Sequence, residues 1–347
     1  IFGLKDFDSS LYYDEFTPAR PSYVESGRSL IRQIMDKDLF LFYPYHSMQT
    51  FIDLLKEASV SPDVVSIKIT IYRLASNSAV AKNLCKAAEN GKEVTVLVEL
   101  RARFDEKNNI EWAKQLEESG CNVIYGIENF KCHSKICLIT LKNKNSFSYI
   151  TQIGTGNYNE KTAGTYTDFS LMTANAEIAA DASNFFKNML IGELYGNYSE
   201  LLVAPSTMRS SIIRLIEAEA SRGENGRIII KANSITERKL IDKLAEASQK
   251  GVKIHLIIRG ICCLVPGVPG KTENITVTSI VGRFLEHSRI YMFGSGENSR
   301  IYISSADIMT RNQSRRVEIA CPVYDSHIKD FITQYVHLLI NDNVKSR

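Results

Sequence analysis

The sequence contains no uninterrupted apolar run long enough to cross a bilayer, and no signal peptide with a basic flank and a small-residue cleavage site. Its charge is nearly balanced, because 42 Lys and Arg side chains oppose 39 Asp and Glu side chains and leave a net charge of +3. That balance by itself does not indicate a polyanionic partner. These absences favour a cytoplasmic protein without a transmembrane segment, and they leave peripheral attachment to a membrane open.

The cysteines also lack the spacing that is typical of a zinc site or a disulfide scaffold. There are seven, an odd number, and no two of them form a CxxC pair. We expect them to be reduced and mostly buried, with no zinc site and no disulfide scaffold. The remaining composition, 44% hydrophobic and 23% charged, is that of a folded globular protein, and 347 residues are enough for two domains.

A pattern of strand, helix and strand occurs twice, and each helical stretch ends at a glycine. This alternation predicts an α/β protein with a mixed, helix-covered sheet in each half. We place the domains at 20–198 and 199–347, with residues 1–19 as a lead-in segment. The repeated segments are 64–73, 79–92 and 94–104 in the first half, and 226–234, 237–251 and 252–263 in the second.

Each half also contains a histidine two residues before a long cation. KCHSKICLI (131–139) contains His133 and Lys135, and FLEHSRIYMF (284–293) contains His287 and Arg289. Both runs predict strands. A single pair of this kind is more often a core histidine beside an edge lysine. Because the pattern is repeated, we interpret both pairs as functional.

The chemistry that these pairs permit is phosphoryl transfer. A neutral imidazole can attack phosphorus while a second histidine handles a proton, and the two cations can hold phosphate oxygens. In the turn IGTGNYN, Gly154 and Gly156 let backbone N–H groups come close to a phosphate, and Asn157 and Asn159 offer side-chain amides as further phosphate ligands. SSADIMTRN is the counterpart of this turn in the second half. A glycine turn alone would more often be only a tight loop.

Arginines gather at the expected strand ends, at the carboxyl edge where α/β sheets usually bind ligands. They are Arg73, Arg101 and Arg103 in the first half and Arg259 in the second. Guanidinium groups grip phosphate oxygens bidentately. Ion pairs with nearby acids in ELRARFDE are the alternative interpretation of any one of them.

These motifs together resemble the phospholipase D superfamily, whose two domains meet across a pseudo-twofold interface. They resemble most closely the bacterial type-one polyphosphate kinase family, whose carboxy-terminal half has two such domains. Thr140 stands where most phospholipase D enzymes carry an acid after the lysine, and Arg289 replaces a lysine, which fits the kinase branch. The longest resembling stretches are LFLFYPYHS (39–47), IYRLAS (71–76), VELRARFDEKNNIEWAK (98–114) and IGTGNYNEKTAGTYTDFSLMTA (153–174).

The resemblance implies reversible transfer of the terminal phosphate of ATP to polyphosphate through a phosphohistidine. His133 is then the phosphorylated nucleophile and His287 the second histidine, acting as proton donor or stabiliser. Tyr166 and Arg259 are implied nucleotide and phosphate contacts. A Mg²⁺ site is implied near Arg73 and Arg103, which would hold phosphate oxygens that the metal also touches, because a guanidinium cannot ligate a cation.

The implied partners are ATP or ADP and inorganic polyphosphate, without nucleic acid. The resemblance further implies that an amino-terminal half is missing, that the full-length protein forms homo-oligomers, and that this fragment alone is weakly active or inactive. Two alternatives remain open. One is a phospholipase D-type phosphodiesterase acting on phospholipid or nucleic acid, and the other is a polyanion-binding scaffold without activity.

Overall fold

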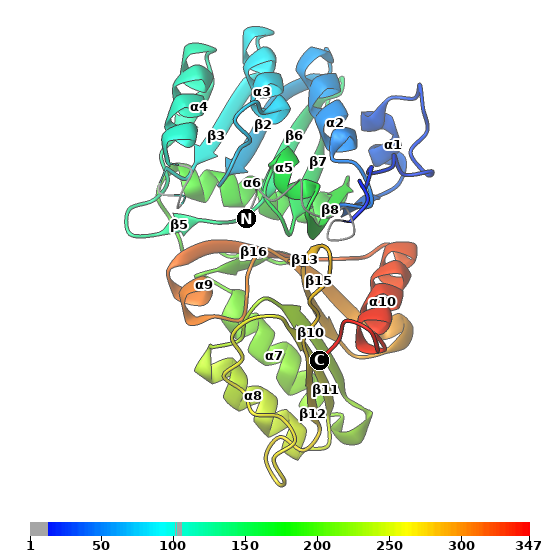
Figure 1. Cartoon of the computed structure of the whole chain (residues 1–347). Coiled ribbons are helices and arrows are strands. Elements are labelled where there is room, and N and C mark those ends of the chain that lie inside the picture. The colour runs from blue at the N-terminus through cyan, green and yellow to red at the C-terminus, as the bar shows by residue number, and fades with distance from the viewer. Residues whose placement is uncertain (1–12, 101, 103–105) are drawn as a thin grey trace.

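The computed structural model describes residues 13–100, 102 and 106–347, which form two lobes stacked on one another (Figure 1). The first lobe ends with helix α6 (Ala176–Leu190), and the second begins with strand β9 (Leu202–Ala204). The boundary expected at residues 198–199 falls between these elements and stays a prediction. Residues 1–12 of the expected lead-in segment lie outside the described residues.

The first lobe is built on a mixed sheet with the strand order β1-β8-β7-β6-β2-β3-β4. Strands β2, β3 and β4 are parallel, and the remaining neighbours are antiparallel. The strands are β1 (Leu39–Tyr43), β2 (Val64–Ile71), β3 (Glu93–Val98), β4 (Asn122–Ile124), β6 (Ile136–Lys142), β7 (Phe147–Gly154) and β8 (Tyr166–Thr173).

Helices α2, α3 and α4 cover one face of this sheet (Figure 1). Their apolar residues bury against alternate residues of β2, such as Ile67 and Ile69, because successive strand side chains point to opposite faces. Gly91 follows α3 with φ +79°, a conformation that glycine adopts without strain. The remaining helix bounds are α1 (Leu30–Asp36), α2 (Gln49–Val60), α3 (Ala79–Glu89), α4 (Glu106–Glu118) and α5 (Glu160–Ala163).

The second lobe repeats this plan with the strand order β12-β11-β10-β14-β15-β16, and β9 pairs with β16. Its strands are β10 (Arg227–Ala232), β11 (Lys253–Ile258), β12 (Ile275–Thr278), β14 (Arg289–Phe293), β15 (Arg300–Ser304) and β16 (Arg316–Pro322). Its helices are α7 (Met208–Ala220), α8 (Arg238–Gln249), α9 (Thr310–Ser314) and α10 (Ser326–Ile340), with 3₁₀ turns η2 (Gly223–Asn225) and η3 (Gly296–Asn298). No described helix combines the length and the apolar character that a membrane span requires.

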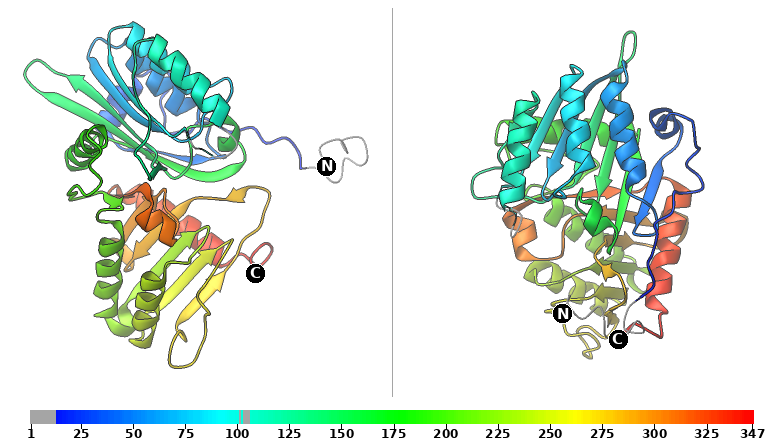
Figure 2. Two further views of the ribbon diagram at one scale, coloured as in Figure 1. Left: turned by 90° about the vertical axis from the view of Figure 1, so that its left-hand side faces the viewer. Right: turned by 45° about the horizontal axis from the view of Figure 1, so that its top comes forward.

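The lobes share an apolar core where they meet (Figure 2). This core joins Phe169 of β8 and Phe185 of α6 to residues of the second lobe, among them Ile290 of β14 and Ile332 of α10. Burial of about 25 cal/mol per Å² of apolar surface stabilises such a contact. The structure thus confirms the expected α/β fold of two tandem domains, each with a mixed sheet flanked by helices.

Two short strands are exchanged between the lobes. Strand β5 (Lys131–Cys132) precedes β6 of the first lobe in the chain, but it pairs in parallel with β16 of the second. Strand β13 (Leu285–Glu286) belongs to the second half and pairs in parallel with β8 of the first. Each exchanged strand directly precedes one histidine of the repeated motif, so the two histidines lie between the lobes.

The expectation of one continuous strand through each motif is wrong. The chain leaves strand geometry at 133–135, between β5 and β6, and again at 287–288, between β13 and β14. The physical reason is the exchange, because β5 hydrogen-bonds to the second lobe while β6 hydrogen-bonds to the first. Strand alternation therefore does not decide where His133 and Lys135 point.

Candidate active site

His133 is held at both its backbone and its ring by the second lobe. The backbone N–H groups of His133 and Ser134 donate to the carbonyl of Val317 in β16, each over 2.9 Å. The ring Nδ1 lies 2.9 Å from Oε2 of Glu318, the next residue of β16. Both side chains are buried. A carboxylate of one lobe thus orients the histidine of the other.

His287 has the reciprocal arrangement. Its ring Nδ1 lies 2.9 Å from Oδ1 and 2.8 Å from Oδ2 of Asp168 in β8 of the first lobe. Its backbone N–H donates to the hydroxyl of Thr167 over 3.2 Å, and the N–H of Ser288 donates to the carbonyl of Thr167. The site therefore contains two histidine–carboxylate pairs that cross the interface in opposite directions.

A hydroxyl fixes each of these carboxylates. Thr155 donates to Oδ1 of Asp168 over 2.6 Å, and Ser305 donates to Oε2 of Glu318 over 2.5 Å. The same 150 residues separate Thr155 from Ser305 and Asp168 from Glu318. The two halves thus build one hydroxyl–carboxylate–imidazole unit twice.

Gly156 makes room for one of these carboxylates. A Cβ atom at this position would lie 2.2 Å from Oδ2 of Asp168, closer than any contact allows. The sequence suggested that this glycine lets a phosphate approach the backbone. The structure shows a local packing requirement, which the position would have without any ligand.

The electrostatics keep both histidines neutral. Burial lowers the pKa of His133 to about 3 against the opposing attraction of Glu318. Burial and the charge of Arg289 lower the pKa of His287. Burial acts to raise the pKa of Glu318, but His133 and Lys135 hold it below its usual range. An ionised carboxylate beside Nδ1 requires Nδ1–H, so the lone pair of each ring lies on Nε2.

Two buried cations accompany the histidines. The Nζ atom of Lys135 donates to the carbonyl of His133 and lies 5.4 Å from the ring centre of Tyr72. Burial lowers the pKa of Lys135 to about 7, and the charge of Arg289 also lowers it. The Nη1 atom of Arg289 lies 3.3 Å from the carbonyl oxygen of Thr155 and 3.0 Å from Nε2 of His287. Arg289 thus reaches the first lobe, and the two repeated motifs meet.

A polar chain connects Arg289 to Arg259. Asp307 pairs with Nε of Arg289 at 3.1 Å and with Nη2 at 3.2 Å. Asn233 donates from its backbone and its side chain to Oδ1 of Asp307, each over 2.8 Å, and accepts from Nε of Arg259 over 2.6 Å. Although burial opposes ionisation, Arg289 holds the pKa of Asp307 far below its usual range. These hydrogen bonds fix the orientation of the guanidinium groups of Arg259 and Arg289.

A tyrosine ring lies against each histidine. The ring centres of Tyr72 and His133 are 4.7 Å apart, with the rings nearly perpendicular at 80°. Those of Tyr166 and His287 are 5.1 Å apart at 53°. Tyr166 was expected as a nucleotide contact, and the structure places it beside the second histidine.

The structure places some of the other predicted site residues, and others lie outside the described residues. Arg73 follows β2 and lies over the ring of Tyr72 at 5.5 Å, whereas Arg101 and Arg103 lie outside the described residues. Asn159 caps α5, because its side-chain oxygen accepts from the N–H of Thr162 over 3.0 Å. Oδ1 of Asn157 is buried and has no hydrogen-bond partner among the described residues.

Sequence reasoning missed the residues that orient the histidines. Thr155, Ser305 and Asp307 lie in the turns IGTGNYN and SSADIMTRN, which had been matched between the halves, and Asp168 and Glu318 lie in the segments that follow these turns. The signal that could have found them is the repeat itself. Acids at equivalent places in YTDFSLMT and in VEIACPVYD indicate a duplicated role.

The described residues do not fit a protein-built magnesium site. No group of three His, Cys, Asp or Glu side chains that could hold a metal occurs among them. The carboxylates nearest the histidines, Asp168, Glu318 and Asp307, are already engaged by imidazole or guanidinium groups. A Mg²⁺ ion would therefore need ligands that these side chains do not supply.

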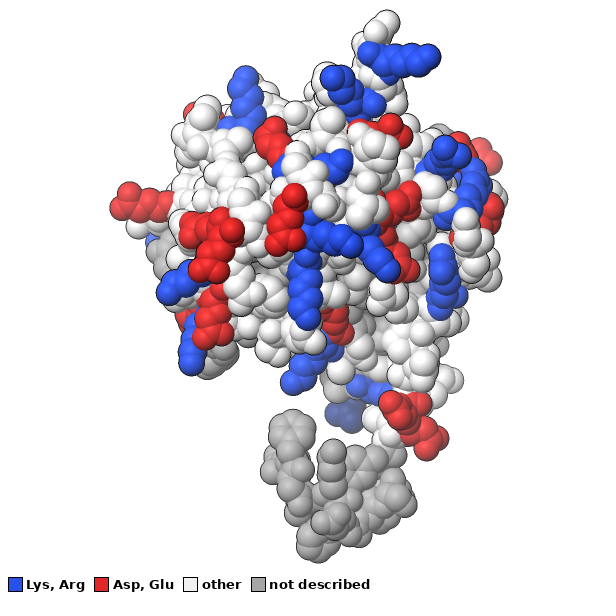
Figure 3. Space-filling view, turned by 90° about the horizontal axis from the view of Figure 1, so that it is seen from above, with Lys and Arg blue, Asp and Glu red and all other residues white. Residues whose placement is uncertain are grey.

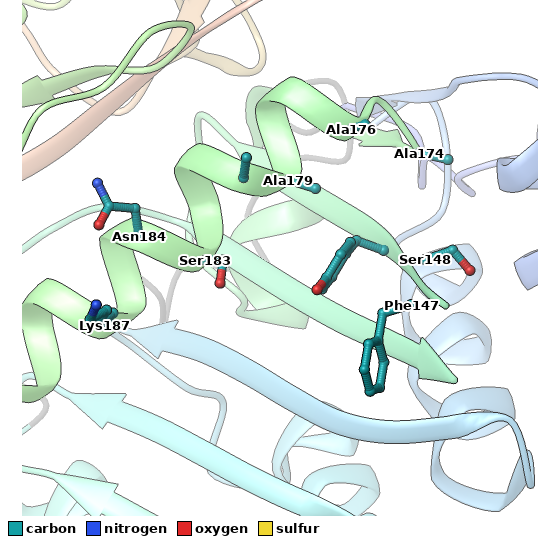
Figure 4. Close-up of a pocket in the computed structure, with 10 residues that line it drawn as sticks. Phe147, Ser148, Ala174, Ala176, Ala179, Ser183, Asn184 and Lys187 are labelled. Carbon is teal, nitrogen blue, oxygen red and sulfur yellow. The ribbon is translucent and has the colours of Figure 1, made fainter. Parts of the chain in front are cut away.

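Two surface features carry none of the predicted site residues. A cavity of about 540 Å³ between β7 and α6 is lined by small residues with Phe147 at one end and Lys187 at the other (Figure 4). On the outer face of the first lobe, cationic and anionic side chains are interspersed (Figure 3). The buried or half-buried cations Lys135, Arg259 and Arg289 lie instead near the interface of the lobes.

Comparison with known proteins gives matches along most of the chain. The family model described as polyphosphate kinase C-terminal domain 1 matches residues 29–194, and that of C-terminal domain 2 matches residues 201–347. The polyphosphate kinase of Staphylococcus epidermidis is 46% identical, over 100% of this chain and 48% of the relative. That of Bacillus anthracis is 44% identical, over 97% of this chain and 48% of the relative. The chain spans about half the length of these relatives.

Comparison with solved structures gives the same family. The crystal structure of polyphosphate kinase from Porphyromonas gingivalis has a TM-score of 0.89 at 39% identity and covers 97% of this chain and 52% of that one. The phosphatidylserine synthase of Haemophilus influenzae has a TM-score of 0.60 at 13% identity, covers 90% of this chain and 87% of that one, and so shares the fold alone. The chain belongs to the polyphosphate kinase family and corresponds to its two carboxy-terminal domains.

Proposed function

We propose that this chain carries the catalytic site for reversible transfer of the terminal phosphate of ATP to polyphosphate, through a phosphohistidine at His133. The observation that carries the proposal is a difference between the two rings. The Nη1 atom of Arg289 lies against the ring of His287, 3.2 Å from Nδ1 and 3.0 Å from Nε2, whereas no guanidinium hydrogen-bonds to the ring of His133 within the described part of the chain. Positive charge can therefore develop more easily on the ring of His133, as attack by its Nε2 requires.

The first step forms a bond between Nε2 of His133 and the γ-phosphorus. The bond from that phosphorus to the β–γ bridging oxygen breaks, and ADP leaves with the electron pair. As Nε2 becomes substituted, the ring gains positive charge, which Glu318 stabilises through its hydrogen bond to Nδ1–H. In the second step an end oxygen of polyphosphate attacks the phosphorus and the N–P bond breaks.

The neighbouring cations neutralise the phosphate oxygens. Lys135 and Arg289 belong to the two motifs, and Arg259 is aimed by Asn233. Such fixed charges stabilise a phosphoryl-transfer transition state because they need no reorganisation during the reaction. The anionic substrate also favours the protonated form of His287, and in that form His287 can act as the proton donor or stabiliser. Tyr166, Asn157 and Asn159 are proposed to contact the nucleotide or its phosphates.

Mg²⁺ bound to the substrate would supply further neutralisation of phosphate charge. Arg73 and Arg103 are proposed to hold the same phosphate oxygens. The cytoplasmic location, peripheral membrane attachment and oligomeric state of the full-length protein stay predictions.

Labelling with γ-³²P-ATP tests the proposal. We expect an acid-labile, base-stable phosphate on His133, because a phosphoramidate hydrolyses in acid, and we expect the label to leave when unlabelled ADP is added. A phospholipase D-type phosphodiesterase would instead retain the alcohol-bearing portion of its phosphodiester substrate. Label that is stable to acid, or that lies on another residue, would overturn the proposal.

Binding of the phosphate chain is expected to weaken at alkaline pH. The buried Lys135 has a pKa of about 7, below its value in the unfolded chain, so its charged form predominates below pH 7 and is lost as the pH rises. The KM for polyphosphate should then rise by up to about tenfold per pH unit above pH 7, because only the ammonium form attracts the anion. Steady-state kinetics between pH 6 and 9 measure this dependence.

Lys135→Arg is the matched control. A guanidinium stays charged throughout this range, so the KM of this variant should be nearly independent of pH even where turnover is reduced. If the profiles of Lys135→Arg and the parent protein had the same shape, another group would be responsible for the dependence.

A further inference from the structure

One largely buried charged cluster at the interface has no part in the proposed chemistry. The Nζ atom of Lys231 in β10 lies 3.1 Å from Oε2 of Glu286 in β13. Tyr335 of α10 donates to the same oxygen over 2.7 Å, and Thr167 of β8 does so over 3.1 Å. Lys231 also donates to the hydroxyl of Ser288 over 2.9 Å and to its carbonyl over 3.1 Å. The cluster surrounds His287, which lies between Glu286 and Ser288.

At the three corresponding positions the first half has neutral residues, although the buried carboxylate of Glu99 accepts from the N–H of Cys132 nearby. Thr70 donates to the carbonyl of Ser134 over 2.8 Å, as Lys231 does to that of Ser288. Cys132 precedes His133 as Glu286 precedes His287. Phe185 is the tenth residue of α6, as Tyr335 is of α10. Three neutral residues around one histidine thus correspond to an ion pair and a hydroxyl around the other.

This asymmetry indicates a role beyond folding. Burial of an ion pair costs desolvation, and apolar residues of similar volume usually stabilise a fold at least as well. Thr70, Cys132 and Phe185 show that the fold accepts a neutral set at this place. A charged cluster can fix the orientation of its neighbours, because charge-assisted hydrogen bonds hold their partners in one geometry.

The contacts lead directly to His287. The hydroxyl of Thr167 donates to Glu286 and accepts from the backbone N–H of His287 over 3.2 Å. The next residue of β8 is Asp168, which holds the ring of His287. Beside His133 the place of Thr167 is taken by Val317 of the second lobe, so the first motif lacks this link. A shift of Glu286 would therefore move the backbone of His287 relative to Asp168.

We propose that Lys231, Glu286 and Tyr335 form a positioning group that holds His287 against Asp168. The group acts through the exchanged strand β13 and touches neither substrate nor the reacting atoms. It gives the second histidine a fixed ring that does not depend on substrate binding. The catalytic consequence rests on the proposed function, since it assumes that His287 takes part in the transfer.

The test replaces the three residues of the group by their counterparts from the first half, in the triple variant Lys231→Thr, Glu286→Cys, Tyr335→Phe. The chain has six histidines, so selective ¹⁵N-histidine labelling resolves their ring nitrogens by NMR. We expect the two ring nitrogens of His287 to shift toward their average, since Nδ1–H no longer meets Asp168 in one geometry. The ring of His133 should be unchanged and serves as the internal control.

Turnover gives a second readout. In the active protein the triple variant should lose kcat by roughly 10- to 100-fold, the effect of a misplaced catalytic group, at an unchanged KM for ATP. His287 resonances and kcat equal to those of the parent protein would overturn the proposal. The NMR result does not need turnover, so it stands apart from the proposed function, which fails separately if His133 takes no label.

Two further variants cover the case in which the triple variant does not fold. Tyr335→Phe removes one hydrogen bond to Glu286 and keeps the ion pair, so we expect a smaller shift of His287 in the same direction. Glu286→Gln leaves the charge of Lys231 buried without its partner and should lower the melting temperature by roughly 5–10 °C. His287 resonances unaltered in both single variants would contradict a positioning role.

Discussion

Replacing His133 by alanine is expected to abolish phosphate transfer in both directions. The variant lacks the imidazole whose Nε2 is proposed to attack the γ-phosphorus, so no phosphoramidate can form at this position. Loss of a covalent nucleophile typically costs a factor of roughly 10⁴–10⁶ in turnover. The measurements are ATP formation from ADP and polyphosphate, and incorporation of ³²P from γ-labelled ATP.

Two controls separate chemistry from folding. His133→Gln retains a donor for the buried Glu318 and should be equally inactive but more stable than His133→Ala. His255→Ala changes a half-buried histidine of β11 whose Nε2 lies 3.1 Å from the hydroxyl of Thr278, away from the interface of the lobes, and should keep full turnover. If His133→Ala still took up ³²P, now on His287, the proposed roles of the two histidines would be reversed.

The repeat was the most predictable feature of the fold. Local signals fix its elements, namely apolar periodicity over 64–73 and 237–251 and a glycine after each helix. Gly91 and Gly251 both adopt positive φ, as a helix end requires. The histidine motifs were predictable for the same reason, since each lies within one short stretch of sequence.

The exchanged strands could not be predicted from local pattern. KCHSKICLI has the composition of a single strand, but β5 and β6 join different sheets, and the partner of β5 lies almost 190 residues away in β16. Pairing over such a separation depends on how the lobes meet. The same holds for His133 with Glu318 and for His287 with Asp168, whose contacts exist only in the assembled interface.

The turn IGTGNYN shows how local structure can imitate a ligand site. Gly156 was interpreted as phosphate access, and it is also required by the carboxylate of Asp168. Asn159 was interpreted as a phosphate ligand, and its oxygen caps a helix. Both residue types occur for conformational reasons as often as for binding, so sequence alone does not separate the two roles.

The second large effect is expected from Glu318→Gln. Three donors converge on this carboxylate, because Asn312 donates to Oε1 over 2.5 Å while Ser305 and Nδ1 of His133 reach Oε2. A glutamine must turn its NH₂ group toward one side. If that group faces His133 it donates to Nδ1 and drives the ring proton to Nε2, which removes the nucleophilic lone pair. If it faces Asn312, whose Oδ1 has no hydrogen-bond partner among the described residues, the amide of Asn312 can turn and accept, and the ring of His133 keeps its proton on Nδ1.

The first orientation should reduce turnover by roughly 10³–10⁴-fold, the effect of a wrong histidine tautomer, with a smaller change in the KM for ATP. The second orientation keeps the tautomer and loses only the negative charge that stabilises the substituted ring, so its loss should be smaller. Steady-state kinetics measure the loss, and ¹⁵N NMR of labelled histidine identifies the tautomer of His133. The matched control is Glu237→Gln, a buried acid that caps α8, which should lower stability and leave kcat intact. A Glu318→Gln variant with the proton of His133 on Nε2 that kept more than a tenth of its turnover would show that His133 acts without a fixed tautomer. The carboxylate of the opposite lobe would then serve only to join the two domains.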